Sequence, residues 1–188
     1  MAGGIFDMMQ QLKGTRTEEN LRTAFAGESQ ARNKYTYYAK QAQEDGYHQI
    51  SEIFRITALN EEQHAKIWFK LLNDGIGTTA ENLKNAAEGE HFEWTKMYAD
   101  FAKVAQEEGF SQIARLFQGV ADIEQAHEQR FLTLERAVRD GTVFSSGEET
   151  TVWICRNCGH ITVGPQAPQV CPICAHPQSY FQRRAENY

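Results

Sequence analysis

The sequence contains one metal-ligand motif twice, and this duplication limits the folds that the chain can adopt. The motif is Glu-x-x-His, present as Glu61 to His64 and again, 63 residues later, as Glu124 to His127. Positions i and i+3 of an α-helix lie on one face about one turn apart, so each motif directs a carboxylate and an imidazole to one point. Two such helices that face each other would bind a pair of metal ions. Helical bundles with dinuclear sites use this pattern together with one further Glu from each of the two remaining helices.

The duplication extends beyond the motif and predicts where the remaining glutamates lie. Segments 35–64 and 98–127 are identical at 13 of 30 positions. Upstream, the match continues only when the offset falls from 63 to 62, which pairs Glu28 with Glu90. The second copy adds Glu93, three residues after Glu90 and on the same helical face. The expected ligands of the dimetal site are therefore Glu28, Glu61, His64, Glu90, Glu93, Glu124 and His127.

The charge of these glutamates favours a metal site over a purely structural role. Five carboxylates buried together would repel one another and lose their hydration, at a cost of several kcal/mol for each buried ion. Two ferrous ions would supply +4 and two ferric ions +6 against the −5 of the five glutamates in this set. A single Glu-x-x-His is weak evidence, since such residues are usually solvated or packed in a core. Two copies in register predict a dimetal bundle.

The additional residue in the second copy predicts a local irregularity in its helix. One residue inserted into an α-helix would rotate everything beyond it by about 100°. A π-bulge absorbs the insertion and leaves the flanking helix in phase, and such bulges are frequent at functional sites. We therefore predict a π-bulge between Glu90 and Tyr98. Tyr35 and Tyr98 occupy equivalent positions, and either hydrogen bonding to the ligand carboxylates or core packing would explain them.

The four cysteines of the chain form a second metal-binding pattern. They are arranged as two Cys-x-x-Cys knuckles separated by twelve residues, Cys155 and Cys158, then Cys171 and Cys174. Four thiolates at one apex suit tetrahedral Zn²⁺ or iron equally, and the spacing alone favours zinc. Disulfides are less favoured because the sequence shows no secretory signal.

Composition and charge set further limits. A chain of 188 residues has room for one helical bundle and one small domain. The cysteine-containing tail is too short to form its own core, so a bound metal must supply much of its folding free energy. The net charge of −6 argues against a nucleic-acid partner. No apolar run approaches the eighteen or so residues that cross a bilayer, so we expect a soluble protein without membrane association.

Helix-capping residues and glycine-rich turns in the sequence predict where helices and strands begin and end. Helices are predicted over about 18–45, 48–73, 90–108 and 111–140. Thr17 is the expected cap of the first helix. Residues 74–89 are expected to form a long crossover with a short helical piece after Thr79, and 142–151 a bendable linker before a strand at Thr151–Ile154. We expect domains over 1–146 and 147–188.

The duplicated Glu and Glu-x-x-His pattern, the additional Glu93 and the paired cysteine knuckles together resemble the rubrerythrin family over essentially the whole chain. The resemblance implies a mainly α fold, a ferritin-like four-helix bundle with one long crossover, followed by a small rubredoxin-like β domain. It implies two non-haem iron ions in the bundle and, in place of zinc, one iron held by the four cysteines. It also implies reduction of hydrogen peroxide to water in the cytoplasm.

The two centres suggest a division of labour. Electrons from an external donor, rubredoxin or an NAD(P)H-dependent reductase, would pass through the cysteine-bound iron to the diiron site, within a head-to-tail homodimer. Glu61 and Glu124 would bridge the metals, and Glu93 and His64 would alternate as ligands, as in similar proteins. Glu28 would be terminal on one iron, Glu90 and His127 on the other.

Other functions account for the sequence less well. A ferroxidase or iron-storage protein would not need the tail, and a zinc-stabilised binding module would leave the glutamates unexplained. An oxygenase would need a substrate cavity.

Overall fold

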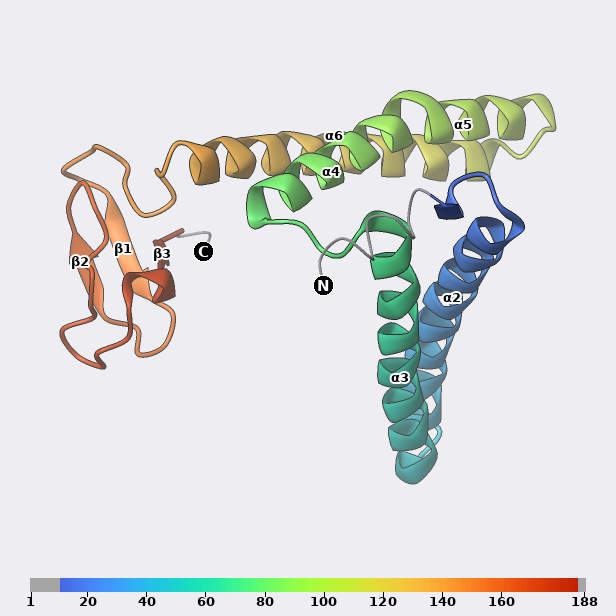
Figure 1. Ribbon diagram of the computed structural model, residues 1–188, viewed down its shortest axis with the longest axis horizontal. Coiled ribbons are helices and arrows are strands. Elements are labelled where there is room, and N and C mark those ends of the chain that lie inside the picture. The colour runs from blue at the N-terminus through green and yellow to red at the C-terminus, as the bar shows by residue number, and fades with distance from the viewer. Residues whose placement is uncertain (1–10, 186–188) are drawn as a thin grey trace. The chain divides into compact units, whose positions relative to one another are not determined.

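The computed structural model describes residues 11–185. The chain divides into two compact units, and the boundary in the sequence lies between Ile76 and Gly77. The first unit is an antiparallel hairpin of α2 (Arg16–Glu44) and α3 (His48–Asn73), which lie side by side (Figure 1). Gly46 turns the chain between them at φ 86°, a conformation that favours glycine. The buried Ser51 hydroxyl donates a 2.7 Å hydrogen bond to the carbonyl of Ala39 and joins the two helices.

The start of α2 differs from the prediction. Thr15 caps the helix and accepts a hydrogen bond from the Glu18 amide at 3.2 Å, so the prediction of Thr17 as the cap was wrong. The carboxylate of Glu18 accepts a bond of 2.7 Å from the amide of Gly14 in return. Thr15 and Glu18 thus satisfy the amides of Glu18 and Gly14 at the helix start, which explains the choice of cap.

The second unit begins with a long helical run antiparallel to α6 (Ser111–Arg139) (Figure 1). The run consists of α4 (Thr79–Phe92), the π-helix η1 (Glu93–Met97) and α5 (Tyr98–Glu107). A capping box of Thr78 and Glu81 starts it. The predicted crossover over 74–89 was therefore wrong in extent, because the helix begins eleven residues before Glu90 and only residues 74–78 connect α3 to α4.

The predicted π-bulge is confirmed. Residues Glu93–Met97 form a π-helix, and the amide of Tyr98 bonds the carbonyl of Glu93, five residues earlier. The irregularity lies between Glu90 and Tyr98, where the offset between the two sequence copies changes. The widened turn therefore accommodates the additional residue of the second copy.

The internal repeat is also visible in the packing of aromatic side chains. Each hairpin contains one trio of rings, Tyr35, Tyr38 and Phe54 in the first and Tyr98, Phe101 and Phe117 in the second. The ring centroids are 6.3, 6.1 and 5.7 Å apart in the first trio and 6.2, 6.0 and 5.6 Å apart in the second. The two helical hairpins are thus two copies of one packing pattern.

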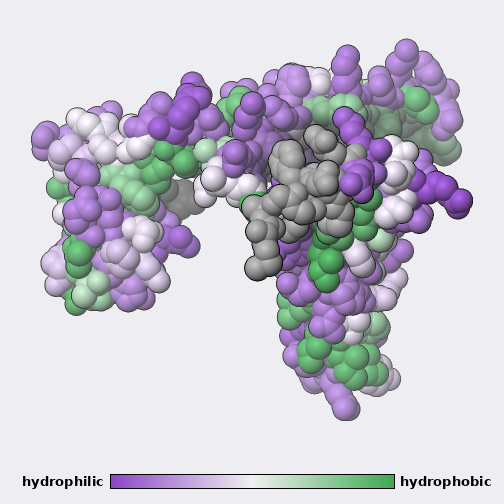
Figure 2. Space-filling model, in the orientation of Figure 1, coloured by the Kyte–Doolittle hydropathy of each residue, from purple (hydrophilic) through white to green (hydrophobic). Residues whose placement is uncertain are grey.

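The hairpins bury small residues and leave many large apolar side chains at the surface. The buried helical residues among those described are Ala39, Ala42, Ser51, Ala58, Ala65, Ala87, Ala105, Ala114 and Ala121. Hydrophobic residues reach the surface along the α2–α3 hairpin (Figure 2), where Ile50, Ile53 and Leu59 are exposed. Two paired helices enclose no core for large side chains, so these faces are available for further packing.

The C-terminal part is a small β domain, as predicted. Strand β1 (Val152–Cys155) pairs antiparallel with both β2 (Ile161–Val163) and β3 (Phe181–Arg183), in the order β2-β1-β3. Its core consists of Trp153, Cys155, Ala167, Cys171 and Phe181. Two members of this core are cysteines, so the metal ligands are part of the domain's packing.

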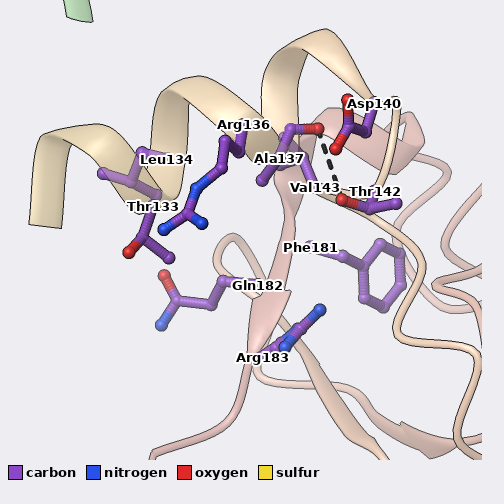
Figure 3. A pocket seen from close by; sticks show the side chains of 10 residues that line it. All are labelled: Thr133, Leu134, Arg136, Ala137, Asp140, Thr142, Val143, Phe181, Gln182 and Arg183. Atoms are coloured by element: carbon purple, nitrogen blue, oxygen red, sulfur yellow. Dashed lines mark hydrogen bonds between the residues drawn. The ribbon is translucent and has the colours of Figure 1, made fainter.

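The predicted linker is only partly free. Ser145 pairs with Gln166, the Ser146 amide bonds the Pro165 carbonyl at 2.8 Å, and Phe144 packs against the β-domain core. A cavity of about 600 Å³ lies beside it, between the last turns of α6 and β3 (Figure 3), but none of the predicted ligands lines it. Among the described residues, no helix is long and apolar enough to cross a membrane.

Candidate metal centres

The first unit brings Glu28, Glu61 and His64 together. Glu28 comes from the middle of α2, and the other two lie one turn apart on α3. The Nδ1 atom of His64 is 2.8 Å from Oε2 of Glu61 and 3.8 Å from Oε1 of Glu28. Their ligand atoms all lie within 4.8 Å of one another, as donors around one metal ion would.

The second unit repeats this arrangement with Glu90, Glu124 and His127. The Nδ1 atom of His127 is 2.6 Å from Oε2 of Glu124 and 3.7 Å from Oε1 of Glu90. The ligand atoms again lie within 4.8 Å of one another. The two hairpins therefore carry equivalent groups of two carboxylates and one imidazole, placed by the same helical spacing.

Glu93 stands apart from these groups, although it is close to the second one. It is the first residue of the π-helix, and its charge adds to burial in raising the pKa of both Glu90 and Tyr98. Six of the seven predicted ligands thus form two groups of three. The seventh lies at the irregular turn beside them.

The second group raises the pKa of one of its own carboxyls. Burial is the main cause of the raised pKa of Glu90, followed by the charge of Glu124 and a hydrogen bond with it, while His127 acts in the opposite direction. Burial, then the charges of Glu93, Glu124 and Glu90, also raise the pKa of Tyr98. Negative charge is therefore concentrated here, as a metal-binding group requires.

The donor chemistry of the two groups fits a diiron site. Carboxylate and imidazole donors from facing helices are the ligands that di-iron carboxylate bundles use. Each group offers one imidazole and two carboxylates, which are the donor types that such a site would use. A metal would also offset the repulsion from Glu124 that adds to burial in raising the pKa of Glu90.

The four cysteines gather at one point of the β domain and fit a single iron. The sulfur atoms of Cys155 and Cys174 are 3.7 Å apart, and those of Cys158 and Cys171 are 3.6 Å apart. A tetrahedral site with metal–sulfur bonds of about 2.3 Å has sulfur–sulfur distances of about 3.8 Å. The thiols are therefore spaced for a rubredoxin-like Fe(Cys)₄ site.

The two cysteine knuckles have the same backbone hydrogen bonds. The amide of Cys155 bonds the carbonyl of His160 at 2.9 Å, and that of Cys171 bonds the carbonyl of His176 at 2.8 Å. The amide of His176 lowers the pKa of the Cys174 thiol to about 7. For Cys158 the amide of His160 acts in the same direction, but burial and hydrogen bonds with the other three thiols outweigh it and raise the pKa to about 12. The metal-free cluster thus holds its protons unequally.

One residue beside the second group was missed by the sequence analysis. Glu128 follows His127 directly, and its carboxylate accepts a 2.6 Å hydrogen bond from the indole Nε1 of Trp94. Its other oxygen lies 3.0 Å from Nδ1 of His91. The signal available in the sequence is the spacing of Glu128 four residues after Glu124, which places both on one helical face. Trp94 is half-buried at this contact.

Taken together, the helical ligand groups and the separate cysteine site define a metalloprotein with two kinds of metal centre. Family models agree with both parts: "Rubrerythrin" matches residues 19–135 and "Rubrerythrin, rubredoxin-like domain" matches residues 153–182. The chain belongs to the rubrerythrin family.

Curated relatives cover nearly the whole chain. The chain is 47% identical to rubrerythrin of Porphyromonas gingivalis, over 97% of this chain and 96% of that protein. It is 48% identical to rubrerythrin of Nitratidesulfovibrio vulgaris, over 96% of this chain and 100% of that protein. A solved structure of partially reduced nigerythrin is 31% identical over 90% of this chain and 87% of that chain, with a TM-score of 0.35.

Proposed function

We propose that this protein is a peroxidase that reduces hydrogen peroxide to water with electrons from an external donor. The reaction consumes one peroxide, two electrons and two protons and yields two water molecules. The observation that supports it is the presence, in one chain, of two Glu₂His groups and a Cys₄ group. Family membership supports oxidoreductase activity in general, and the peroxide substrate is our inference from these two sites.

The ligand types divide the work between the sites. When iron is bound, the helical site supplies two electrons together and the cysteine site transfers them singly. The four cysteine ligands leave no open position for substrate, whereas the carboxylate and imidazole groups do. We therefore assign peroxide binding to the helical ligands and electron entry to Cys155, Cys158, Cys171 and Cys174.

We assign individual roles to the helical ligands. Glu61 and Glu124 would be shared by both metals, Glu28 would hold one of them, and Glu90 and His127 would hold the other. Glu93 and His64 would alternate as ligands, since anionic Glu93 suits the oxidised state and neutral His64 the reduced state. The greater exposure of the His64 side chain, 51% against 34% for His127, supports His64 as the ligand that moves.

Tyr98 has a supporting role in this proposal. Its pKa is raised by burial and by the charges of Glu93, Glu124 and Glu90, so the phenol keeps its proton at neutral pH. A protonated Oη close to these carboxylates is a hydrogen-bond donor for a ligand oxygen. Tyr35 occupies the equivalent position in the first hairpin and has the equivalent proposed role.

The electron path defines the partners and the setting. We propose rubredoxin or an NAD(P)H-dependent reductase as the donor, a head-to-tail homodimer as the assembly, and the cytoplasm as the compartment. The unit that contains the Cys₄ site also contains α4, α5 and α6, and a neighbouring copy can present this site to the helical ligands. An iron-oxidising storage protein would use the helical ligands but would leave the Cys₄ site without a role.

The test separates the two sites. Cys158→Ser should abolish peroxide turnover with the external donor and bleach the visible absorbance of the oxidised tail. It should leave the single oxidation of chemically reduced protein by one equivalent of peroxide within about twofold of wild type. Equal loss of both reactions would show that electron entry and peroxide reduction are assigned to the wrong sites. Iron oxidation without peroxide consumption would favour the storage protein.

A further inference from the structure

We propose that the cavity between the end of α6 and strand β3 binds a reduced flavin that carries a phosphate, and that this flavin supplies electrons to the cysteine site. The inference rests on the proposed function in one respect, because it takes the Cys₄ site as the point of electron entry. It adds a small-molecule donor to the protein donors proposed above. The cavity has a volume of about 600 Å³, and ligand and cofactor pockets in proteins usually have about 300–1,000 Å³.

A short segment that is bonded at both ends joins the helix wall of this cavity to its strand wall. At its start, the amide of Thr142 bonds the carbonyl of Ala137, in the last turn of α6, at 2.8 Å. At its end, Phe144 packs against the β-domain core, and its carbonyl accepts a 2.9 Å bond from the amide of Ala167. Val143 alone separates the two anchored residues in the sequence, so the segment limits how far the walls can separate.

The walls of the cavity offer an apolar surface for a ring system. Leu134 and Ala137 line it from α6, Val143 from the short segment and Phe181 from β3 (Figure 3). Apolar walls with a few placed polar groups are typical of pockets that bind cofactors. The body of the ligand is therefore expected to be apolar or aromatic.

Two guanidinium groups at the cavity favour an anionic group on that ligand. Arg136 extends from α6 toward β3, where Arg183 lies (Figure 3). In the described part of the chain, the Arg136 guanidinium donates one hydrogen bond, from Nε to the Leu132 carbonyl at 3.3 Å. The Arg183 guanidinium likewise donates one, from Nη2 to the Ser145 carbonyl at 3.4 Å. Both retain N–H groups for phosphate oxygens, which guanidinium groups bind in pairs.

The negative groups near the cavity are offset by their own partners. Of the described residues that line it, only Asp140 is acidic, and its carboxylate lies 3.4 Å from Nε of Arg139. The C-terminal end of α6 opposes an anion through its dipole. There, however, the amides of Asp140 and Thr142 bond the carbonyls of Arg136 and Ala137. The two lining arginines therefore leave the cavity with a net positive charge.

Phe181 connects the cavity to the cysteine site. It lines the cavity and also belongs to the core that contains Cys155 and Cys171. In the sheet, Phe181 lies directly opposite Cys155, and the Cα atoms of such a pair are about 5 Å apart. A ligand in the cavity is therefore one side chain away from the cysteine site, which is a suitable position for an electron donor.

The way in which the cysteine site accepts electrons selects the class of donor. In the proposed function this site accepts electrons singly, whereas a dihydronicotinamide transfers a hydride. A reduced flavin can release its two electrons one at a time. Each reduced flavin gives two electrons and two protons and becomes oxidised flavin. Reduction of one peroxide to two water molecules consumes the same two electrons and two protons, so the overall reaction balances without another reductant.

Binding of flavin mononucleotide (FMN) to the iron-loaded protein is the first test, measured by isothermal titration calorimetry. The double variant Arg136→Gln with Arg183→Gln should weaken FMN binding by about tenfold or more, because charge-assisted hydrogen bonds to the phosphate are lost. Riboflavin lacks the phosphate, so it should bind wild type and the double variant alike. Arg115→Gln is the control for net charge, since Arg115 is an exposed residue of α6 that does not line the cavity.

A cavity-filling variant provides a test that does not depend on charge. Ala137→Trp places an indole in the cavity from its helix wall, and it should block both FMN and riboflavin. The visible absorbance of the tail shows whether the β domain of each variant remains folded around its iron. Unchanged FMN affinity in Ala137→Trp and in the double arginine variant would overturn the inference, as would the absence of saturable FMN binding to wild type.

Electron delivery is the second test. Photoreduced FMN is mixed with the oxidised protein without oxygen, and the bleaching of the tail is followed by stopped flow. The rate should saturate with the FMN concentration and should fall in the double arginine variant and in Ala137→Trp. Reduced methyl viologen is a cation that needs no guanidinium partner, so it should bleach the tail of every variant alike. FMN binding without faster bleaching would overturn the inference, because the proposed site is a donor site.

The two proposals fail in different ways. Saturable bleaching of the tail by reduced FMN, with no consumption of peroxide afterwards, would contradict the proposed function and support the flavin site. Peroxide turnover with a protein donor, together with no FMN binding, would overturn the flavin site and leave the proposed function in place.

Discussion

The indole of Trp94 and the carboxylate of Glu128 are joined by a hydrogen bond of 2.6 Å that ties the π-helix to α6. Trp94 is the second residue of the π-helix, and Glu128 directly follows the predicted ligand His127. The same carboxylate lies 3.0 Å from His91, one residue after the predicted ligand Glu90. One half-buried side chain therefore links the segments that carry Glu90, Glu93 and His127.

This relationship predicts that Glu128 positions the ligands without binding metal. Glu128→Ala should weaken metal binding at the helical site by about tenfold, as is usual when a partner behind the ligands is removed. Glu128→Gln keeps an acceptor for Trp94 and should recover most of the affinity. Competition with a chelator measures both, and the visible absorbance of the tail is the internal control. An equal loss of metal affinity in Glu128→Ala and Glu128→Gln would show that the charge of Glu128 matters more than its hydrogen bond to Trp94.

The π-helix is expected to serve the site at the expense of helix stability. Deletion of Lys96, an exposed residue of this turn, should convert it to a regular α-helix while α5 keeps its packing on α6. Thermal stability should be retained or raised. Peroxide turnover should fall at least tenfold, because Glu90 and Glu93 could no longer both reach the metals.

Deletion of Lys34 is the matched control. This exposed residue lies in the regular helix α2, where no widened turn can absorb the loss. Everything beyond the deletion would rotate by about 100°, so the variant should unfold at a much lower temperature than wild type. Similar melting curves for both deletions would contradict the role that we give to the π-helix.

The two cysteine knuckles differ at one strained position. Gly159 follows the first knuckle at φ 77°, and Ala175 occupies the same place in the second at φ 57°. An alanine in this left-handed region costs about 1 kcal/mol. Ala175→Gly should therefore slow loss of iron from the tail to a chelator, and Gly159→Ala should accelerate it. The rate at which the visible absorbance of the tail bleaches measures iron loss in both variants. Faster bleaching in Ala175→Gly than in wild type would show that Ala175 is not strained.

The parts of the site that sequence predicted are those set by local geometry. Spacing of i and i+3 within one helix places Glu61 beside His64 and Glu124 beside His127, whatever the rest of the fold does. The change of offset between the copies likewise predicted the π-helix, because helical phase is a local property. Each Cys-x-x-Cys motif likewise brings its own two cysteines together by local spacing, whereas the β domain brings the two motifs together.

The missed features depend on competition or on distant partners. Thr15 and Thr17 are both acceptable caps. The bonds that Glu18 makes, from its amide to Thr15 and from the Gly14 amide to its carboxylate, favour Thr15. The early start of α4 depends in the same way on Glu81, which completes the box with Thr78. Glu128 escaped notice because its partner Trp94 is 34 residues away on another helix.

The raised pKa of Glu90 predicts how metal binding depends on pH. Burial, then the neighbouring Glu124, raise the pKa of this carboxyl above its ordinary value of 4.5. A metal binds the deprotonated form, so protons compete from a higher pH than at an ordinary glutamate. Affinity for Mn²⁺ should fall as the pH drops through this raised range. Glu93→Gln removes one nearby negative charge and should move the fall to lower pH. An unchanged midpoint in a Mn²⁺ titration series would count against this coupling.

The same pKa shift has the opposite effect on the metal-free fold. A carboxyl with a raised pKa in the folded state binds its proton more tightly there than in the unfolded chain. Its contribution to stability is therefore present below pH 4.5, the ordinary pKa, and is lost as the pH rises through the raised value. Glu90→Gln removes this dependence. Thermal melts of the metal-free protein between about pH 4 and pH 7 should show stability falling more steeply with pH in wild type than in Glu90→Gln. Parallel curves would mean that Glu90 is not the group responsible, and added metal should reverse the slope in wild type alone.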